Sequence, residues 1–98
     1  MIMLKLDSWP EFEFDEAKSR LNRRKHGIDF VQAQALWLDP DAVELLVQEE
    51  SEERWMVIGA TGGRLWSAVI TYRQGRVRII SVRRSRPKEV ARYEEDQH

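Results

Sequence analysis

The chain lacks several features that would assign it to a familiar class. Its 98 residues include no cysteine, which excludes disulfides and cysteine-ligated zinc and fits a reducing compartment such as the cytoplasm. It has only two histidines, of which one is terminal, so no metal site is expected. No apolar run approaches the roughly 20 residues that cross a membrane. The N-terminus is too short and too soon acidic for a signal peptide.

The composition is typical of a single compact domain over residues 1–98. Hydrophobic residues make up 42% of the chain and charged residues 34%, which suits a folded domain with one core. The formal net charge is only −1, yet the charges are strongly segregated. Residues 28–53 carry eight acids and no base, whereas residues 54–88 carry nine bases and no acid. A second basic block, residues 18–27, has five bases and no acid.

This segregation allows two interpretations. The acidic and basic blocks could pair with each other in the fold. Alternatively, the basic blocks bind a polyanion, because the local field rather than the net charge steers such a ligand. On the second interpretation, residues 54–88 are where a nucleic acid would bind.

The N-terminal third predicts one short strand followed by two helices. Residues 11–14 alternate polar and apolar, as in a half-buried edge strand after Pro10. Asp15 is a good N-cap for a helix over residues 16–26, which Gly27 ends. The bases of the last turn complement the helix dipole, so the basic run there has a structural explanation as well as a functional one.

Apolar spacing predicts how the two helices pack. Ala17 and Leu21 would form the buried face of the first helix. Asp29 and Gln32 form a capping-box-like pair that opens a second helix, which ends before Pro40. Its core positions by helical spacing are Phe30, Ala33 and Trp37, with Val31, Ala35 and Leu38 beside them.

Four further strands and a C-terminal helix are predicted. The strands cover residues 42–47, 54–59, 64–73 and 77–82, with hairpin turns at Thr61-Gly62-Gly63 and Gln74-Gly75. Pro87 starts the last helix, with Ser85 as its cap and Val90 and Tyr93 as its anchors. The expected fold is α+β: a four- to five-stranded antiparallel sheet with two N-terminal helices and a C-terminal helix.

The side chains available for chemistry are Lys, Arg, Glu and one internal His. RNA can be cleaved without a metal, because the 2′-hydroxyl is the nucleophile and side chains can supply a base, an acid and a cationic phosphate clamp. The candidates are Glu53 as base, Lys25 or His26 as base or acid, and Arg73, Arg83 and Arg84 as the clamp. The alternative is that these are solvated charges at sheet edges and at a helix end.

Motifs along most of the chain resemble those of the BrnT toxin family. In chain order they are Phe12-Glu13-Phe14-Asp15-Glu16-Ala17-Lys18, Lys25-His26-Gly27-Ile28-Asp29-Phe30, Leu38-Asp39-Pro40-Asp41, Glu52-Glu53-Arg54-Trp55, Val69-Ile70-Thr71-Tyr72-Arg73 and Val77-Arg78-Ile79-Ile80-Ser81-Val82-Arg83-Arg84. The resemblance covers about residues 11–95. Phe14, Val82 and Ser85 depart from it, since Trp, Ala and Ala are usual at these positions.

The resemblance implies a RelE-like fold and a bacterial endoribonuclease toxin of a type II toxin–antitoxin pair, with no cofactor. It also implies a BrnA-like antitoxin with a ribbon-helix-helix part, and a complex that binds operator DNA and represses its own operon. Carried over by position, the catalytic candidates are Lys25, Glu53, Arg73 and Arg83, with His26 as a neighbour that either caps the helix or takes part in catalysis. The residues expected to bind RNA are Arg24, Arg54, Arg64, Arg76 and Arg84.

Two alternatives from other classes stay open. The basic region could belong to a non-catalytic nucleic-acid-binding or regulatory module, or to an interaction domain that holds an acidic partner segment. Salt-sensitive binding without cleavage would favour the first alternative. Binding to a protein partner alone would favour the second.

Overall fold

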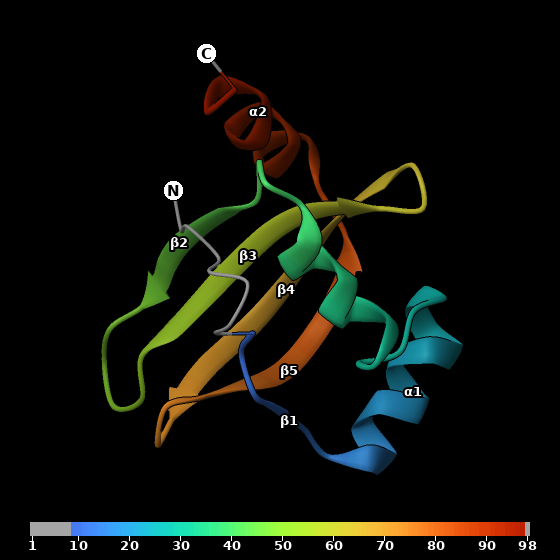
Figure 1. Cartoon of the computed structure of the whole chain (residues 1–98), viewed down its shortest axis with the longest axis vertical. Helices are drawn as coiled ribbons and strands as arrows, with labels where there is room; N and C mark the ends of the chain where they lie inside the picture. Colours follow the sequence, from blue (N-terminus) through green and yellow to red (C-terminus); the bar gives the residue numbers. More distant parts are fainter. Residues whose placement is uncertain (1–8, 98) are drawn as a thin grey trace.

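The computed structural model describes residues 9–97, which fold into one five-stranded sheet with three helices around it (Figure 1). In chain order the elements are β1 (Phe12–Glu13), α1 (Glu16–His26), the 3₁₀ helix η1 (Gln32–Leu38), β2 (Val43–Gln48), β3 (Arg54–Thr61), β4 (Arg64–Arg73), β5 (Arg76–Arg84) and α2 (Pro87–Glu95). The predicted α+β class is confirmed. The expectation about the extreme N-terminus concerns residues outside the described range.

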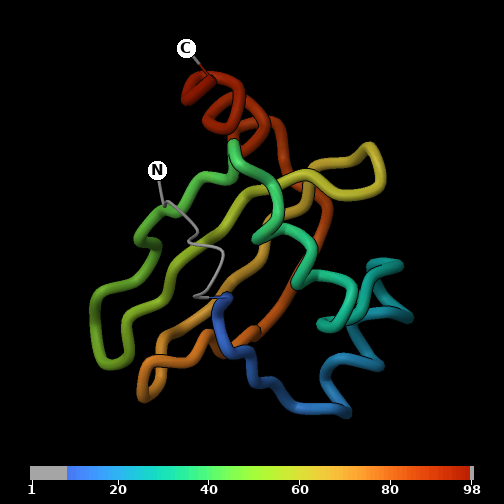
Figure 2. The backbone as a smooth tube through the Cα atoms, viewed as in Figure 1, coloured from blue at the N-terminus to red at the C-terminus, as the bar shows by residue number. Residues whose placement is uncertain are grey.

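The sheet is mixed, so the prediction of a fully antiparallel sheet is wrong. Its strand order is β1-β5-β4-β3-β2. β1 runs parallel to β5, with Phe12 opposite Val77, while the other neighbouring pairs are antiparallel. After β1 the helices carry the chain to the far edge of the sheet, and the meander returns it to β5 beside β1 (Figure 2). The local pattern of residues 11–14 does not encode the direction of this pairing, because the crossover decides it.

Both predicted hairpin turns are present. Gly62 (φ 62°) and Gly63 (φ 76°) connect β3 to β4, and Gln74 (φ 51°) and Gly75 (φ 80°) connect β4 to β5. Positive φ at both central residues is typical of the two-residue turn that matches the twist of the flanking strands. These turns fix the register of the strands that carry most of the arginines.

The ends of α1 lie where the sequence predicts them. The Asp15 side chain accepts a hydrogen bond from the Lys18 backbone N–H at 3.0 Å, and this bond lowers the pKa of Asp15. Gly27 ends the helix in the left-handed region, with φ 82°. The prediction of its buried face is wrong, because Leu21 is 46% exposed.

The buried face of α1 consists of two polar residues, Ser19 and Asn22. The Asn22 amide accepts from the Val82 N–H at 3.2 Å and donates to the Val82 carbonyl at 2.9 Å and to the Ile28 carbonyl at 2.8 Å. The Ser19 hydroxyl accepts from the Phe30 N–H at 2.9 Å. The helix is therefore attached through hydrogen bonds to backbone, which a search for apolar periodicity does not detect.

The second N-terminal helix is a 3₁₀ helix, so the prediction of two N-terminal α-helices is corrected. The capping pair is present: the Gln32 N–H donates to the Asp29 carboxylate at 2.7 Å, and the Asp29 N–H donates to the Gln32 side chain at 2.9 Å. Phe30, Ala33 and Leu36 are almost completely buried, and their spacing of three residues matches the three-residue turn of a 3₁₀ helix. The neighbouring apolar residues that were expected in the core, Val31 and Leu38, are instead 61% and 68% exposed.

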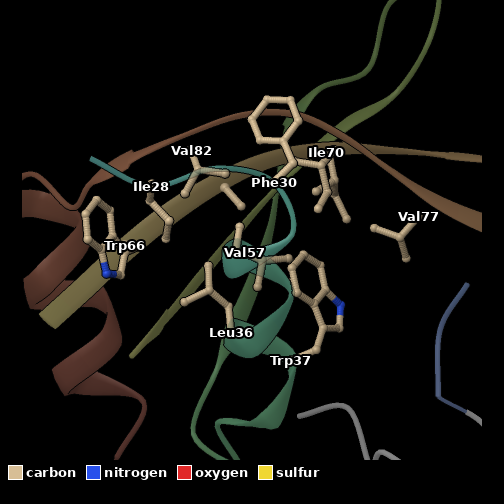
Figure 3. Packing of buried hydrophobic residues seen from close by; sticks show 12 residues of the cluster. Ile28, Phe30, Leu36, Trp37, Val57, Trp66, Ile70, Val77 and Val82 are labelled. Atoms are coloured by element: carbon tan, nitrogen blue, oxygen red, sulfur yellow. The ribbon is translucent and has the colours of Figure 1, made fainter. Parts of the chain in front are cut away.

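The core lies between η1 and one face of the sheet (Figure 3). Its buried members are Ile28, Phe30, Ala33, Leu36, Trp37, Val57, Trp66, Ala68, Ile70, Val77, Ile79 and Val82. Alternate strand residues point to opposite sides of a sheet. We therefore call the side that carries Val57, Ile70 and Val77 the core face and the opposite side the outer face.

α2 packs on the outer face against β3, where Met56 and Ile58 are buried, and polar contacts also attach it. None of its residues is buried. Its N-cap is Arg86, and the predicted cap, Ser85, instead shares a hydrogen bond with the Ser67 hydroxyl at 2.8 Å. Val90 and Tyr93 are half-buried, which agrees with the prediction that they anchor the helix. The Tyr93 hydroxyl donates to the Asp39 carboxylate at 2.7 Å.

Candidate active site

Two rows of side chains cross the outer face near the β4–β5 turn. Arg73 lies directly opposite Arg76, and Thr71 lies directly opposite Arg78. Directly opposed residues share a face of the sheet. Because Ile70 belongs to the core, Thr71 and the arginines of these two rows project to the outer face.

β3 adds a fourth arginine next to these rows. Arg54 is the first residue of β3 and follows Glu53, whose backbone carbonyl accepts a hydrogen bond from the Thr71 hydroxyl at 2.8 Å. The Nε atom of Arg54 is buried and has no hydrogen-bond partner in the part of the chain that the structure describes. A buried donor without a partner is uncommon. We call Arg54, Arg73, Arg76 and Arg78 the arginine rows.

The other three arginines of the rows are each paired with a carboxylate. The shortest distances are 3.0 Å from Arg73 Nε to Glu52, 3.3 Å from Arg76 Nε to Glu11 and 3.1 Å from Arg78 Nη1 to Glu13. The acidic and basic blocks therefore do pair with each other, as one interpretation of the sequence held. The side chains of Arg73 and Arg76 are 50% exposed, so their ion pairs add little stability in water and a polyanion can compete for them.

Arg83 lies farther along the outer face, opposite Ser67. Its two Nη atoms each donate to Glu89 of α2 at 2.8 Å. Glu89 also accepts from the Ser67 hydroxyl at 2.8 Å and from the Arg86 N–H at 2.9 Å. The bond from Arg83 is the main cause that lowers the pKa of Glu89 to about 2, and it also raises the pKa of Arg83. Glu89 is therefore a poor general base, and the fork of Arg83 is occupied.

The remaining candidates lie around a hollow between the end of α1 and the β3–β4 turn. The hollow has a volume of about 520 Å³ and is lined by Gly27, Ile28, Gln32, Thr61, Gly62, Arg64 and Trp66. The Arg84 guanidinium lies 5.7 Å from the centroid of the Trp66 ring. Arg24, Lys25 and His26 belong to the last turn of α1, just before Gly27. We call this region the hairpin hollow.

The basic residues of the hairpin hollow have no counter-charge nearby. Within residues 9–97, no ion pair involves Arg24, Lys25, Arg64 or Arg84. The side chains of Arg64 and Arg84 are exposed. The hollow is therefore open to an anionic ligand without the loss of an existing pair.

The candidate residues divide among three places rather than one. Arg73 and Arg64 are the two ends of β4, and nine residue steps separate them by about 30 Å. Arg83 lies opposite Ser67, six steps and about 20 Å from Arg73. The Glu53 backbone lies beside the arginine rows, because its carbonyl accepts the hydrogen bond from Thr71. A single phosphate cannot contact all five proposed catalytic residues.

Arg78 and Thr71 lie at the candidate site but were not among the residues predicted from the sequence. A signal for Arg78 was present, because Arg76 and Arg78 are two residues apart in a strand and therefore share a face. Thr71 is 2% exposed. Its place beside the arginines follows only from the strand register, because the sequence does not show which residues lie next to it across the sheet.

The described range contains neither a metal-binding cluster nor a helix that could span a membrane. Within residues 9–97, no three His, Asp or Glu side chains gather in a way that could hold a metal ion. None of the helices in that same range is long and apolar enough to cross a membrane.

A small α+β domain with an arginine-rich sheet face and a basic hollow belongs to the class of proteins that bind polyanions. The family model described as the ribonuclease toxin BrnT of type II toxin–antitoxin systems matches residues 14–89. The chain therefore belongs to the BrnT family of ribonuclease toxins, and the resemblance drawn from its motifs is confirmed. A search of curated proteins finds no match. Membership implies an RNA target and an antitoxin protein as partner.

Proposed function

We propose that the chain is an endoribonuclease toxin that cleaves RNA at the arginine rows, by attack of the 2′-hydroxyl and without a metal. Charge that develops on the phosphate in the transition state must be stabilised by groups that are already in place. Four arginines on one face of a rigid sheet supply this charge, and this is the observation that carries the proposal. The family description supports ribonuclease activity in general.

In the proposed reaction, Glu53 acts as general base and removes the proton from the 2′-hydroxyl. The 2′-oxygen bonds to phosphorus while the bond to the 5′-oxygen breaks, which leaves a 2′,3′-cyclic phosphate and a free 5′-hydroxyl. A water molecule protonates the departing oxygen, and Glu53 returns its proton to solvent. Arg73 and Arg78 bind the non-bridging oxygens, because a planar guanidinium can donate two hydrogen bonds to one phosphate.

The other proposed residues have supporting roles. Arg83 positions α2 through Glu89 and does not contact the reacting phosphate, since both of its Nη atoms are engaged. Arg24, Lys25, His26, Arg64 and Arg84 bind RNA that flanks the cleaved bond, because the hairpin hollow lies about 30 Å from Arg73. Their loss should raise KM and leave kcat nearly unchanged.

The first test is cleavage of a single-stranded RNA by purified protein in the presence of EDTA. Glu53→Gln should lower kcat by about 10²-fold or more, and Arg78→Ala by about 10²-fold. Arg92→Ala on α2 is the matched control and should cleave at the wild-type rate. If wild type binds RNA in a salt-sensitive manner but leaves it intact, the chain is the non-catalytic binding module instead.

The antitoxin side of the proposal follows from the resemblance. We propose that the partner is a BrnA-like antitoxin with a ribbon-helix-helix part, that the complex binds operator DNA, and that both act in the cytoplasm. Co-expression should restore growth that the toxin alone arrests. A mobility-shift assay with the operator fragment should show a shift for the complex and none for the toxin alone. A complex that leaves the operator unshifted would contradict the co-repression part.

A further inference from the structure

An apolar strip crosses the core face at the end near the β4–β5 turn. Leu46 lies opposite Trp55, and the Trp55 ring packs edge-on against Tyr72 with centroids 6.4 Å apart. Tyr72 and Phe12 both lie opposite the buried Val77, one on each side. We call Leu46, Trp55, Tyr72 and Phe12, together with Trp9, whose ring lies 6.0 Å from that of Phe12, the aromatic strip.

The strip is exposed although it continues the core. Trp9 and Tyr72 are each 45% exposed and Leu46 is 40% exposed, while Phe12 and Trp55 are half-buried against the core cluster. η1 covers the middle of the core face and contacts the strip through the ring of Trp37, which lies 4.9 Å from that of Phe12, while α1 lies beside β5 (Figure 1). Single exposed apolar residues are ordinary, but a continuous strip with Trp and Tyr marks a protein-binding surface.

The strip ends at a free sheet edge. Among the described residues, β2 is the last strand of the sheet and pairs only with β3, so the backbone groups on its other side are unpaired within that sheet. Val47 on this edge is 49% exposed, and the edge continues into a hollow of about 360 Å³ lined by Leu46, Val47, Gln48, Glu49 and Glu50. An edge of this kind can accept an extended segment as an additional strand.

The surroundings of the strip are acidic. Residues 28–53 contain eight acids and no Lys or Arg. Glu44 accepts a hydrogen bond from the Tyr72 hydroxyl within the strip, and Glu49 and Glu50 follow β2 at the edge. The surface thus has an apolar centre and an acidic rim, the usual anatomy of a protein interface with charge of one sign.

We propose that the aromatic strip and the β2 edge bind the antitoxin, through an extended segment in which apolar residues alternate with Lys or Arg. The apolar residues pack on Leu46 and Tyr72, the basic residues pair with the acidic rim, and the backbone adds a strand to β2. The proposal rests on the antitoxin partnership of the family and not on where RNA is cleaved.

Charge argues against two other occupants. A second copy that paired through β2 would bring its own Glu44, Glu49 and Glu50 close to those of the first copy, and like charges across a strand pair are destabilising. RNA would bring phosphates against Glu44, Glu49 and Glu50. A basic segment of a different protein is the occupant that the charges favour.

The test uses isothermal titration calorimetry of full-length toxin with the purified antitoxin of the same pair. Leu46→Asp should weaken binding at least 30-fold, because it puts a charge in the apolar centre. The double variant Glu49→Lys/Glu50→Lys should weaken binding about 10-fold, and this loss should shrink as salt rises. Val31→Asp is the matched control, since Val31 is 61% exposed but lies outside the strip. It should bind within threefold of wild type.

Two outcomes overturn the proposal. If Leu46→Asp and Glu49→Lys/Glu50→Lys stay folded by circular dichroism and bind within threefold of wild type, the antitoxin binds elsewhere. If light scattering shows a toxin dimer that Leu46→Asp dissociates, the occupant is a second copy. RNA cleavage by the free variants should equal that of wild type. If wild type cleaves no RNA but its antitoxin binding still depends on Leu46, the proposed function fails and this inference stands.

Discussion

Asn22 is a single buried amide that sets the position of a whole helix. Its side chain bonds to both the N–H and the carbonyl of Val82, as the backbone of a neighbouring strand would. β1 is too short to extend along the edge of β5 as far as Val82. Its third bond, to the Ile28 carbonyl, joins the loop after α1 to the same point. The residue next to Val82 is Arg83, so this amide also fixes the place where α2 is attached.

Asn22→Ala should lower the free energy of unfolding by about 2–4 kcal/mol, because it leaves three buried backbone groups without partners. Denaturation in urea measures this difference. Leu21→Ala on the exposed side of the same helix is the control and should change stability by less than about 0.5 kcal/mol. An Asn22→Ala protein as stable as the control would mean that α1 is held by other contacts.

Glu89 has a pKa lowered to about 2 in the folded protein, chiefly by the bond from Arg83. A carboxylate whose pKa is depressed on folding stabilises the protein above its unfolded pKa, and this contribution is lost as pH falls through the folded value. The free energy of unfolding of wild type should therefore exceed that of Glu89→Gln by on the order of 2 kcal/mol at pH 6, and the gap should close between about pH 4.5 and pH 2. A gap that stays constant down to pH 2 would contradict the assigned cause.

α2 illustrates at the element scale how polar contacts add to apolar packing. The helix has no buried residue, and the hydrogen bonds that join its side chains to the rest of the fold come from Glu89 and Tyr93. Arg83→Ala should therefore loosen α2 without unfolding the sheet. Hydrogen exchange of residues 87–95 should become at least about tenfold faster, while that of β3 and β4 stays unchanged. Equal acceleration throughout the sheet would show that α2 and the sheet unfold as one unit.

Local signals in the sequence were sufficient for the existence of the strands, for the hairpin turns and for the ends of α1. Gly62-Gly63 and Gln74-Gly75 adopt the positive φ angles that the turns require, and Asp15 caps α1 as predicted. The errors arose where tertiary contacts decide. The 3₁₀ form of η1 goes with its close packing on β3, where a Cβ at Gly59 would lie 3.2 Å from the Leu36 carbonyl. The register that unites Arg73, Arg76 and Arg78 depends on strand pairing and not on any single motif.

At the scale of the whole molecule, the chain has three separate surfaces that differ in charge, although its net charge is close to zero. The arginine rows lie on the outer face, the aromatic strip with its acidic rim lies on the core face and the β2 edge, and the hairpin hollow lies at the opposite end of β4. The motifs predicted Glu53 and Arg73 as candidates, and the structure places the Glu53 backbone and Arg73 near each other. They could not show that Lys25 and Arg83 lie in other places, because distance along a strand becomes visible only in the folded sheet.

The central claim is that RNA is cleaved at the arginine rows and only held at the hairpin hollow. The most direct measurement is the single-turnover rate of RNA cleavage at saturating enzyme for two double variants, each of which removes two arginines. Arg73→Ala/Arg78→Ala should lower this rate by about 10³-fold, while Arg64→Ala/Arg84→Ala should leave it within about threefold of wild type and only weaken RNA binding. The reverse pattern, with the rate lost in Arg64→Ala/Arg84→Ala and kept in Arg73→Ala/Arg78→Ala, would place the chemistry at the hairpin hollow and contradict the account.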